Sequence, residues 1–203
     1  MKRASSDPAC RSRRAILALG TCVAGLFSFP RLALAEESPV PISLQVELLL
    51  KVAGYDRNLT ERAAAHLKLL VLLKNEDSDS ARSAAQAQLA LSKTTDVLGL
   101  PLESTSAAFV DAPALARRVR AENVALLYLM PGFTDGDLAA IAEALAGVSV
   151  LSVGTLARYV ARGTVLAFDL IGGKPKLLVN LARAKQQHVE LSSSVLKLMR
   201  VIE

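Results

Sequence analysis

Apolar and polar residues follow two different spacings along the chain, one typical of helices and one typical of buried strands. From Val46 to Ala53 the apolar positions recur every three or four residues, which predicts an amphipathic helix. Ser43 is the expected N-terminal cap of this helix, and Gly54 is expected to end it. The alanine-rich segment 78–99 has a similar spacing and predicts the longest helix of the chain.

Dense aliphatic runs predict buried strands. They lie at 67–73, 123–130 and 148–153, and 102–110 is expected to be a further extended run. Between the runs at 123–130 and 148–153, Thr134 is placed to cap a helix and Gly147 to end it. A strand, a helix and a second strand in this order are typical of a parallel strand pair joined by a crossover. The predicted fold class is therefore α/β: a single domain with a mixed, mostly parallel sheet flanked by helices on both faces.

The C-terminal part of the chain is where the sequence is most informative. Two apolar runs, 165–170 and 176–180, flank Gly172 and Gly173. A two-residue turn with positive φ at both positions favours glycine, so these runs predict a C-terminal β-hairpin. A short helix and then a last helix introduced by Ser192 are expected after it.

The predicted hairpin lies between two segments that read LSVGTLARYVARGTVLAF and LLVNLARAKQQHVELSSSVLKLMRVI. This order resembles the C-terminal half of the YfiR-like family of small periplasmic proteins. The chain departs from the family pattern at two places. The family has two glycines where this chain has Gly163-Thr164, and it has a glycine in the region of His188-Val189-Glu190, where this chain has none. The residues that fit the family's tail are Asn180, Leu181, Ala184, Lys185, Leu191, Ser192, Ser193, Leu196 and Leu198.

A weaker similarity to the same family covers 55–59, which reads YDRNL, and 67–73. The resemblance implies a protein that docks on the periplasmic sensor domain of an inner-membrane diguanylate cyclase. There it would hold the cyclase inactive until an envelope signal releases it, and so lower cyclic di-GMP and biofilm output. The sequence contains no readable cofactor signature, since it has neither a Walker loop nor a G-x-G-x-x-G run, and no cofactor is expected.

Residues 1–35 have the three parts of an export signal: a basic start, an apolar stretch and a small-residue cleavage site. Cleavage is expected between Ala35 and Glu36, and the paired Arg13 and Arg14 resemble a twin-arginine motif, although a Sec signal can contain such a pair too. An uncleaved membrane anchor is the competing interpretation, but the apolar stretch is short for a span. The expected organisation is a cleaved signal at 1–35, an extended tail at 36–42 and a YfiR-like α/β domain at 43–203.

Charge and cysteine content change once the signal is set aside. Residues 1–35 hold six of the 24 basic and one of the 19 acidic residues, which leaves 18 of each in the rest of the chain. This balance excludes nucleic acid as an expected partner. Cys10 and Cys22 also lie in the signal, so the exported part has no thiol for a disulfide, a nucleophile or a metal site. Its apolar runs are too short to span a membrane.

Candidate chemistry is sparse. His66 and His188 are far apart in sequence, and Ser192, Ser193 and Ser194 are interpreted as helix capping because no base is placed to activate them. Asp135, Asp137 and Glu143 share a predicted helix, where charges of the first turn and a solvated face explain them. No catalytic, metal-binding or cofactor-binding residue is assigned, and the chain is predicted not to be an enzyme.

One pair of residues is a candidate contact for a ligand or anion. Gly154 and Thr155 are expected where the carboxyl end of a strand meets the start of a helix, a position that accepts anions in α/β folds. A turn at Gly154 with a cap at Thr155 is the competing interpretation.

Two functions remain open from the sequence. The first is the periplasmic regulator that the resemblance implies, with a membrane diguanylate cyclase or another sensor as partner. The second is a periplasmic small-molecule binding module that serves a transporter or a sensor kinase. Apolar residues make up 52% of the chain, which leaves aliphatic surface for such docking or for a homodimer.

Overall fold

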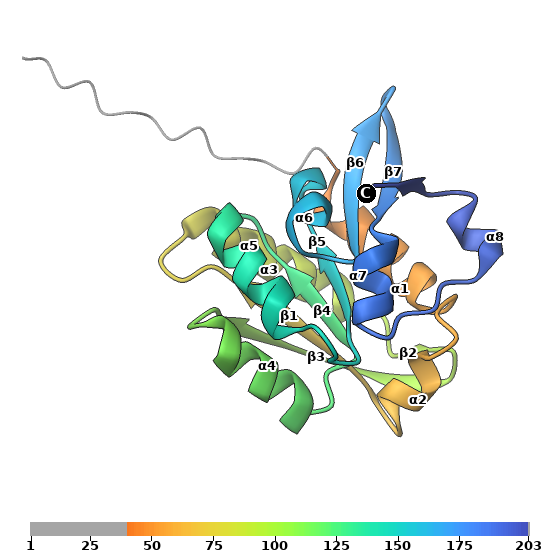
Figure 1. Cartoon of the computed structure of the whole chain (residues 1–203), viewed down its shortest axis with the longest axis horizontal. Helices are drawn as coiled ribbons and strands as arrows, with labels where there is room; N and C mark the ends of the chain where they lie inside the picture. The colour runs from red at the N-terminus through yellow and green to blue at the C-terminus, as the bar shows by residue number, and fades with distance from the viewer. Residues whose placement is uncertain (1–39, 203) are drawn as a thin grey trace, which may run out of the picture. The chain divides into compact units, whose positions relative to one another are not determined.

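The computed structural model describes residues 40–202, and all of them belong to one unit. They form an eight-stranded sheet in the order β2-β3-β1-β4-β5-β6-β7-β8 (Figure 1). The strands are β1 (Leu67–Leu73), β2 (Asp96–Val97), β3 (Leu100–Ala108), β4 (Leu126–Leu129), β5 (Leu151–Gly154), β6 (Leu166–Ile171), β7 (Lys174–Val179) and β8 (Arg200–Val201). The helices are α1 (Ile42–Ala53), α2 (Leu59–Ala63), α3 (Ser78–Leu91), α4 (Ala112–Ala121), α5 (Asp135–Ala144), α6 (Ala157–Arg162), α7 (Leu181–Gln186) and α8 (Ser193–Leu196).

The centre of the sheet is parallel. β1 pairs in parallel with β3 on one side and with β4 on the other, and β5 and β6 continue the parallel arrangement. The strand order therefore reverses at β1, as in doubly wound α/β folds. β4, α5 and β5 form the strand, helix and strand that the sequence predicts.

Each face of the sheet packs against its own group of helices. In β1, Leu69 and Val71 belong to a core shared with α1 and α3, whereas Leu70 and Leu72 belong to a core shared with α4 and α5. Successive side chains of a strand point to opposite faces, so an aliphatic strand can serve both cores. The predicted α/β class, with a mixed and mostly parallel sheet between helices, is confirmed.

The C-terminal hairpin is also confirmed. β6 and β7 pair in antiparallel fashion, and Gly172 and Gly173 have φ of 58° and 74°. Figure 1 shows this hairpin extending beyond the neighbouring strands, because β5 pairs only with Leu166 and Ala167, and β8 only with Leu178 and Val179. Strand β8 itself was not predicted.

Two predicted helix boundaries are wrong. The helix expected over 78–99 ends at Leu91, since Ser92, Thr94 and Thr95 are poor helix formers, and the rest of the segment turns through β2 into β3. Helix α1 begins at Ile42, with Pro41 at its N-cap position. The backbone oxygen of Pro41 accepts hydrogen bonds from two amides of the first turn, and Ser43 lies inside that turn.

The predicted cap of α5 is confirmed: Thr134 Oγ1 accepts a hydrogen bond from the Asp137 amide at 3.2 Å. No helix among residues 40–202 is both long and apolar enough to cross a membrane. The expected signal, with its cleavage site at Ala35 and Glu36, lies outside the described residues.

Candidate functional site

The carboxyl edge of the sheet is where doubly wound folds bind ligands, and Gly154 and Thr155 lie there as predicted, at the end of β5. Both residues are buried. A Cβ added to Gly154 would lie only 2.5 Å from Cβ of Tyr159, so the side chain of Tyr159 covers this glycine. Thr155 does not cap α6, since Leu156 occupies the N-cap position without a side-chain bond. Their contact with an anion stays a prediction.

Aromatic and charged side chains gather at this edge. We call Lys74, Phe109, Phe133, Asp137 and Tyr159 the edge cluster. Lys74 Nζ lies 2.8 Å from Asp137 Oδ2 and 5.5 Å and 5.8 Å from the ring centroids of Phe109 and Phe133. The ammonium thus has an ion-pair partner and two aromatic faces.

The charge of Asp137 is stabilised by its surroundings. Partial burial raises the pKa of this carboxyl, but hydrogen bonds from Lys74 and Thr134 outweigh it, so the pKa is lowered overall. Asp137 was interpreted from the sequence as a favourable charge in the first turn of a helix, and the structure adds the contact with Lys74 from the end of β1.

The hydroxyl of Tyr159 joins two parts of the edge. It donates a hydrogen bond to the backbone oxygen of Met130 at 3.1 Å and accepts one from the amide of Phe133 at 3.1 Å. Arg158 continues the network, because its Nη2 donates to the backbone oxygen of Phe133 at 2.9 Å. The β4–α5 loop is therefore held against α6.

A buried polar pair links α1 to the sheet. Tyr128 Oη donates to Gln45 Oε1 at 2.8 Å, and Gln45 Nε2 donates to the backbone oxygen of Thr155 at 3.3 Å. Burial raises the pKa of Tyr128 well above its ordinary value, so the phenol stays neutral. Sequence reasoning missed this pair, although a glutamine on the buried side of an amphipathic helix is a readable signal.

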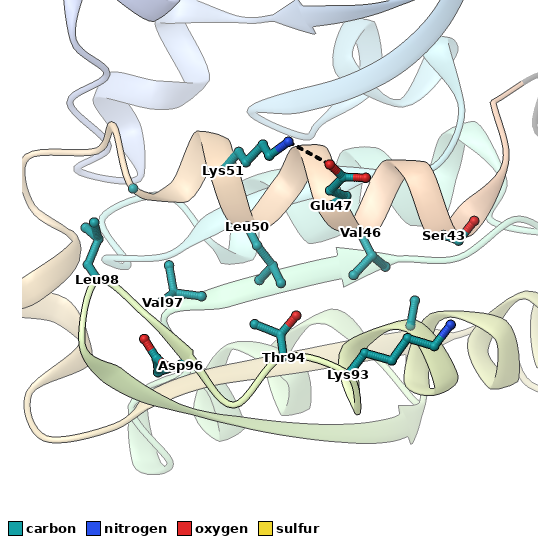
Figure 2. A pocket seen from close by; sticks show the side chains of 12 residues that line it. Ser43, Val46, Glu47, Leu50, Lys51, Lys93, Thr94, Asp96, Val97 and Leu98 are labelled. Carbon is teal, nitrogen blue, oxygen red and sulfur yellow. Dashed lines mark hydrogen bonds and ion pairs between the residues drawn. The ribbon is translucent and has the colours of Figure 1, made fainter.

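An open groove lies between α1 and the segment that joins α3 to β3 (Figure 2). We call it the α1 groove, and its volume is about 570 Å³. In Figure 2, Val46 and Leu50 point into it from α1, opposite Thr94 and Val97, while Lys51 pairs with Glu47 at 2.6 Å on the outer side. The residues that line it are Ser43, Val46, Glu47, Leu50, Lys51, Gly54, Ala90, Lys93, Thr94, Asp96, Val97 and Leu98.

Leu98 closes one end of the α1 groove in an unusual conformation. Its φ is +54°, and that of Gly99 is +77°, so the two residues form a tight turn between β2 and β3. Asparagine and glycine are the usual first residues of such turns. The side chain of Leu98 is 63% exposed and lies 3.6 Å from the position that a Cβ of Gly54 would take.

A buried ion pair holds the YDRNL segment, residues 55–59, in place. Arg62 Nη1 lies 2.8 Å from Asp56 Oδ2, and the two side chains are 3% and 0% exposed. Asp56 Oδ1 also accepts from the amide of Glu190 at 2.9 Å, and Arg62 Nη2 donates to the backbone oxygen of His188 at 3.1 Å. The segment after α1 is thereby attached to the chain that follows α7. A mostly polar pocket of about 620 Å³ adjoins the pair and includes Arg120.

The other candidates from the sequence remain separate. Nδ1 of His66 lies 2.7 Å from Oε1 of Glu103 at the surface, whereas His188 lines the polar pocket beside Arg62. Oγ of Ser192 is hydrogen-bonded to Oγ of Ser194 at 2.8 Å. Within 40–202, no three His, Cys, Asp or Glu side chains are grouped so that they could hold a metal ion.

Sequence comparison matches residues 43–200 to the family model described as YfiR/HmsC-like, DUF4154. No match was found among curated proteins.

Solved structures of low identity share the fold. A conserved domain protein from Vibrio cholerae O1 biovar El Tor has a TM-score of 0.54 and 14% identity, over 80% of this chain and 60% of its own. The ABC domain in complex with L-Trp from Streptococcus pneumoniae has a TM-score of 0.56 and 15% identity, over 80% and 62%. A ligand-free, open substrate-binding protein with adhesive properties from Clostridium difficile has a TM-score of 0.51 and 9% identity, over 72% and 57%. The chain thus spans about three fifths of the length of these structures.

Proposed function

Because this chain belongs to the YfiR/HmsC-like family, we propose that it is a periplasmic regulatory protein that represses an inner-membrane diguanylate cyclase by binding its periplasmic sensor domain. The observation that carries this proposal is the family match, which extends from the first turn of α1 to β8. The role is regulatory and not enzymatic, and its output is lower cyclic di-GMP and less biofilm.

Export is part of the same proposal. Residues 1–35 act as the signal, cleavage occurs between Ala35 and Glu36, and the tail 36–42 leads into the domain. The product works in the periplasm as a monomer or as a homodimer. Fractionation that finds the chain in the cytosol would contradict this part.

The repression requires no bond chemistry. A regulator that binds the inactive state of the cyclase more tightly than the active state shifts the population toward the inactive state. A shift from 1:99 to 99:1 needs about 10⁴-fold tighter binding to the favoured state. An envelope signal would release the cyclase by competing for the regulator.

The projecting hairpin offers apolar surface for such docking. Leu170 and Ile171 at its tip are each 41% exposed, and Lys174 and Lys176 follow in β7. Pro175 lacks an amide hydrogen, which disfavours pairing of a further strand along this edge of β7. Side chains at the tip are therefore the groups that a partner would contact.

The test combines capture of the membrane partner with measurement of cyclic di-GMP. The tagged chain is exported in its native cells, crosslinked and recovered from membranes, while cyclic di-GMP is measured with and without the chain. We expect a membrane diguanylate cyclase in the capture, and lower cyclic di-GMP only when the chain is present. A double variant, Leu170→Ser with Ile171→Ser, tests the hairpin, and Leu89→Ser on the exposed side of α3 is its control. Capture of no membrane signalling protein by a folded, exported chain would refute the proposal.

A second function is supported by the α1 groove. We propose as the alternative that the chain is a small-molecule binding module for a transporter or a sensor kinase. The groove's volume of about 570 Å³ and its apolar walls support this alternative. Ligands that bind the folded state raise its midpoint of thermal unfolding, so a screen of metabolites is the direct test.

A further inference from the structure

We propose that the α1 groove binds a small amphipathic anion, a molecule with one carboxylate or sulfonate and an apolar body. This inference rests on the second proposed function, the small-molecule module, and names its class of ligand. It does not depend on the cyclase as partner.

The size and the walls of the groove fit the apolar body. Small-molecule sites usually occupy about 300–1,000 Å³ and are lined mainly by apolar side chains with a few polar groups. The α1 groove has about 570 Å³ and is walled by Val46 and Leu50 on one side and by Val97 and Leu98 on the other. Ala90 adds to these apolar walls, whereas the pocket beside Arg62 is lined mostly by polar side chains.

The charges that line the groove differ between its two ends, and an anionic head fits the end that carries Lys93. All groove residues belong to the described part of the chain, and there Lys93 Nζ has no hydrogen-bond or ion-pair partner. The other lysine, Lys51, is paired with Glu47 at 2.6 Å. Asp96 lies toward Leu98 in Figure 2, and its Oδ1 is 3.4 Å from the amide of Gly99 in its own turn.

The groove therefore has Lys93 at one end, and Leu98 with the carboxylate of Asp96 beside it at the other end. In Figure 2, Lys93 lies toward Ser43, at the start of α1, and Leu98 lies toward the end of the same helix. No acidic residue occupies the first turn of α1, so the positive end of the helix dipole adds to the field of Lys93. An anionic head fits at the Lys93 end, with its apolar body extending toward Leu98.

The conformation of Leu98 supports a binding role at its end of the groove. A bulky residue with positive φ is unfavourable and persists where the surrounding structure imposes it, often at functional sites. Here the conformation directs an exposed leucine side chain to the end of the groove, beside Gly54. An asparagine would suit the turn better but would remove this apolar contact.

The experiment is a fluorescence titration of the purified chain with 8-anilinonaphthalene-1-sulfonate, a sulfonate with an aromatic body. We expect saturable binding of one probe per chain, displaced by laurate and not by dodecyltrimethylammonium, which carries the same apolar tail on a cation. Lys93→Gln should weaken probe binding about tenfold, as expected for the loss of one charged contact. Leu98→Asn should weaken it about threefold and raise the midpoint of thermal unfolding.

Matched variants control for nonspecific binding. Lys197→Gln removes an exposed lysine that follows α8, and Leu89→Gln removes an exposed leucine of α3, and neither residue lines the groove. Both should bind the probe like the wild type. Binding that is not saturable, or that Lys93→Gln and Leu98→Asn leave unchanged, would overturn the inference. Equal displacement by the cationic competitor would overturn it too.

A last experiment distinguishes whether the anion is a membrane lipid or a free molecule. Sedimentation with phosphatidylglycerol vesicles that Lys93→Gln abolishes would identify a membrane lipid as the amphiphile. Displacement by laurate without sedimentation would identify a free one. The groove variants Lys93→Gln and Leu98→Asn should still capture the membrane partner. Failure of this inference and failure of the proposed repressor function therefore give different results.

Discussion

The edge cluster and the α1 groove contrast two ways of using a surface in one fold. At the carboxyl edge, Lys74 is paired with Asp137 and lies near two aromatic rings, and Tyr159 covers Gly154. In the groove, apolar walls stay open and Lys93 has no partner among the described residues. Satisfied polar groups stabilise a fold, whereas open apolar surface beside an unpaired charge suits recognition.

The contrast shows that the fold alone does not determine where the open surface lies. The strand order reverses at β1, which in doubly wound folds marks the ligand crevice. In this chain the side chains of the edge cluster occupy that region, and the more apolar opening lies beside α1. The similarity to the three solved structures extends to the fold alone. Four variants test whether the edge is structural and the groove is not.

Gly154→Ala should have the largest effect. The new methyl group would lie 2.5 Å from Cβ of Tyr159, and this clash can be relieved only if α6 moves. We expect the free energy of unfolding to fall by about 3 kcal/mol, the upper end of the usual range for overpacking. Urea denaturation measures it. Gly136→Ala, whose methyl group would find only Thr134 Oγ1 at 3.8 Å, is the control and should not destabilise. Equal stability of both variants would contradict a closed edge.

Tyr159→Phe should have the next largest effect. It removes the hydroxyl that bonds the backbone oxygen of Met130 and the amide of Phe133, and both groups are buried. Buried groups that lose their partner cost about 1–3 kcal/mol, and we expect about 2 kcal/mol here. Tyr55→Phe is the control because Tyr55 is exposed. The result would argue against the edge network if both tyrosine variants unfolded at the same urea concentration.

Asp137→Asn should have a smaller effect that depends on pH. At pH 7 the loss of the Lys74 ion pair and of the capping interaction should cost about 1–2 kcal/mol. The pKa of Asp137 is lowered in the folded state, so its contribution is complete above the ordinary value of about 4. This contribution to stability is lost as pH falls through the pKa that Asp137 has in the folded state. Chemical denaturation at pH 7 and at pH 3 should show the gap between wild type and variant closing in acid, and a constant gap would exclude the carboxylate as its cause.

Leu98→Asn should have the smallest effect and the opposite sign. Asparagine adopts positive φ more readily than leucine, so we expect an increase of up to about 1 kcal/mol in the free energy of unfolding. Leu89→Asn, within α3, should instead lower it slightly. Thermal unfolding compares the two. Destabilisation by Leu98→Asn would mean that the leucine is a packing residue and not a binding residue.

Much of the fold was predictable because its signals are local. β1 is recognisable from seven residues with six leucine or valine side chains, and the hairpin from two glycines between apolar runs. The cap at Thr134 follows from the residue type and its position before an apolar face. The strands β2 and β8 were missed because two residues carry no periodicity, and each strand exists only through its partner.

The candidate site was less predictable because its parts come from distant segments. Gly154 was placed correctly at the end of a strand, but nothing nearby in the sequence shows that Tyr159 would cover it. The α1 groove combines α1 with residues that follow α3, and the helix prediction over 78–99 had hidden that turn. Likewise the YDRNL segment was seen as a family feature before its contact with Glu190 gave it a physical reason.

The sequence by itself determined the order of the longer strands and helices, the α/β class and the family, because periodicity, glycine turns and caps act within a few residues. Only the tertiary structure decided which surface is closed and which is open. Burial and pairing depend on side chains far apart along the chain, such as Lys74 with Asp137, whereas Lys93 meets no such partner among the described residues. The free energy of those contacts is a property of the packed chain and not of any one segment.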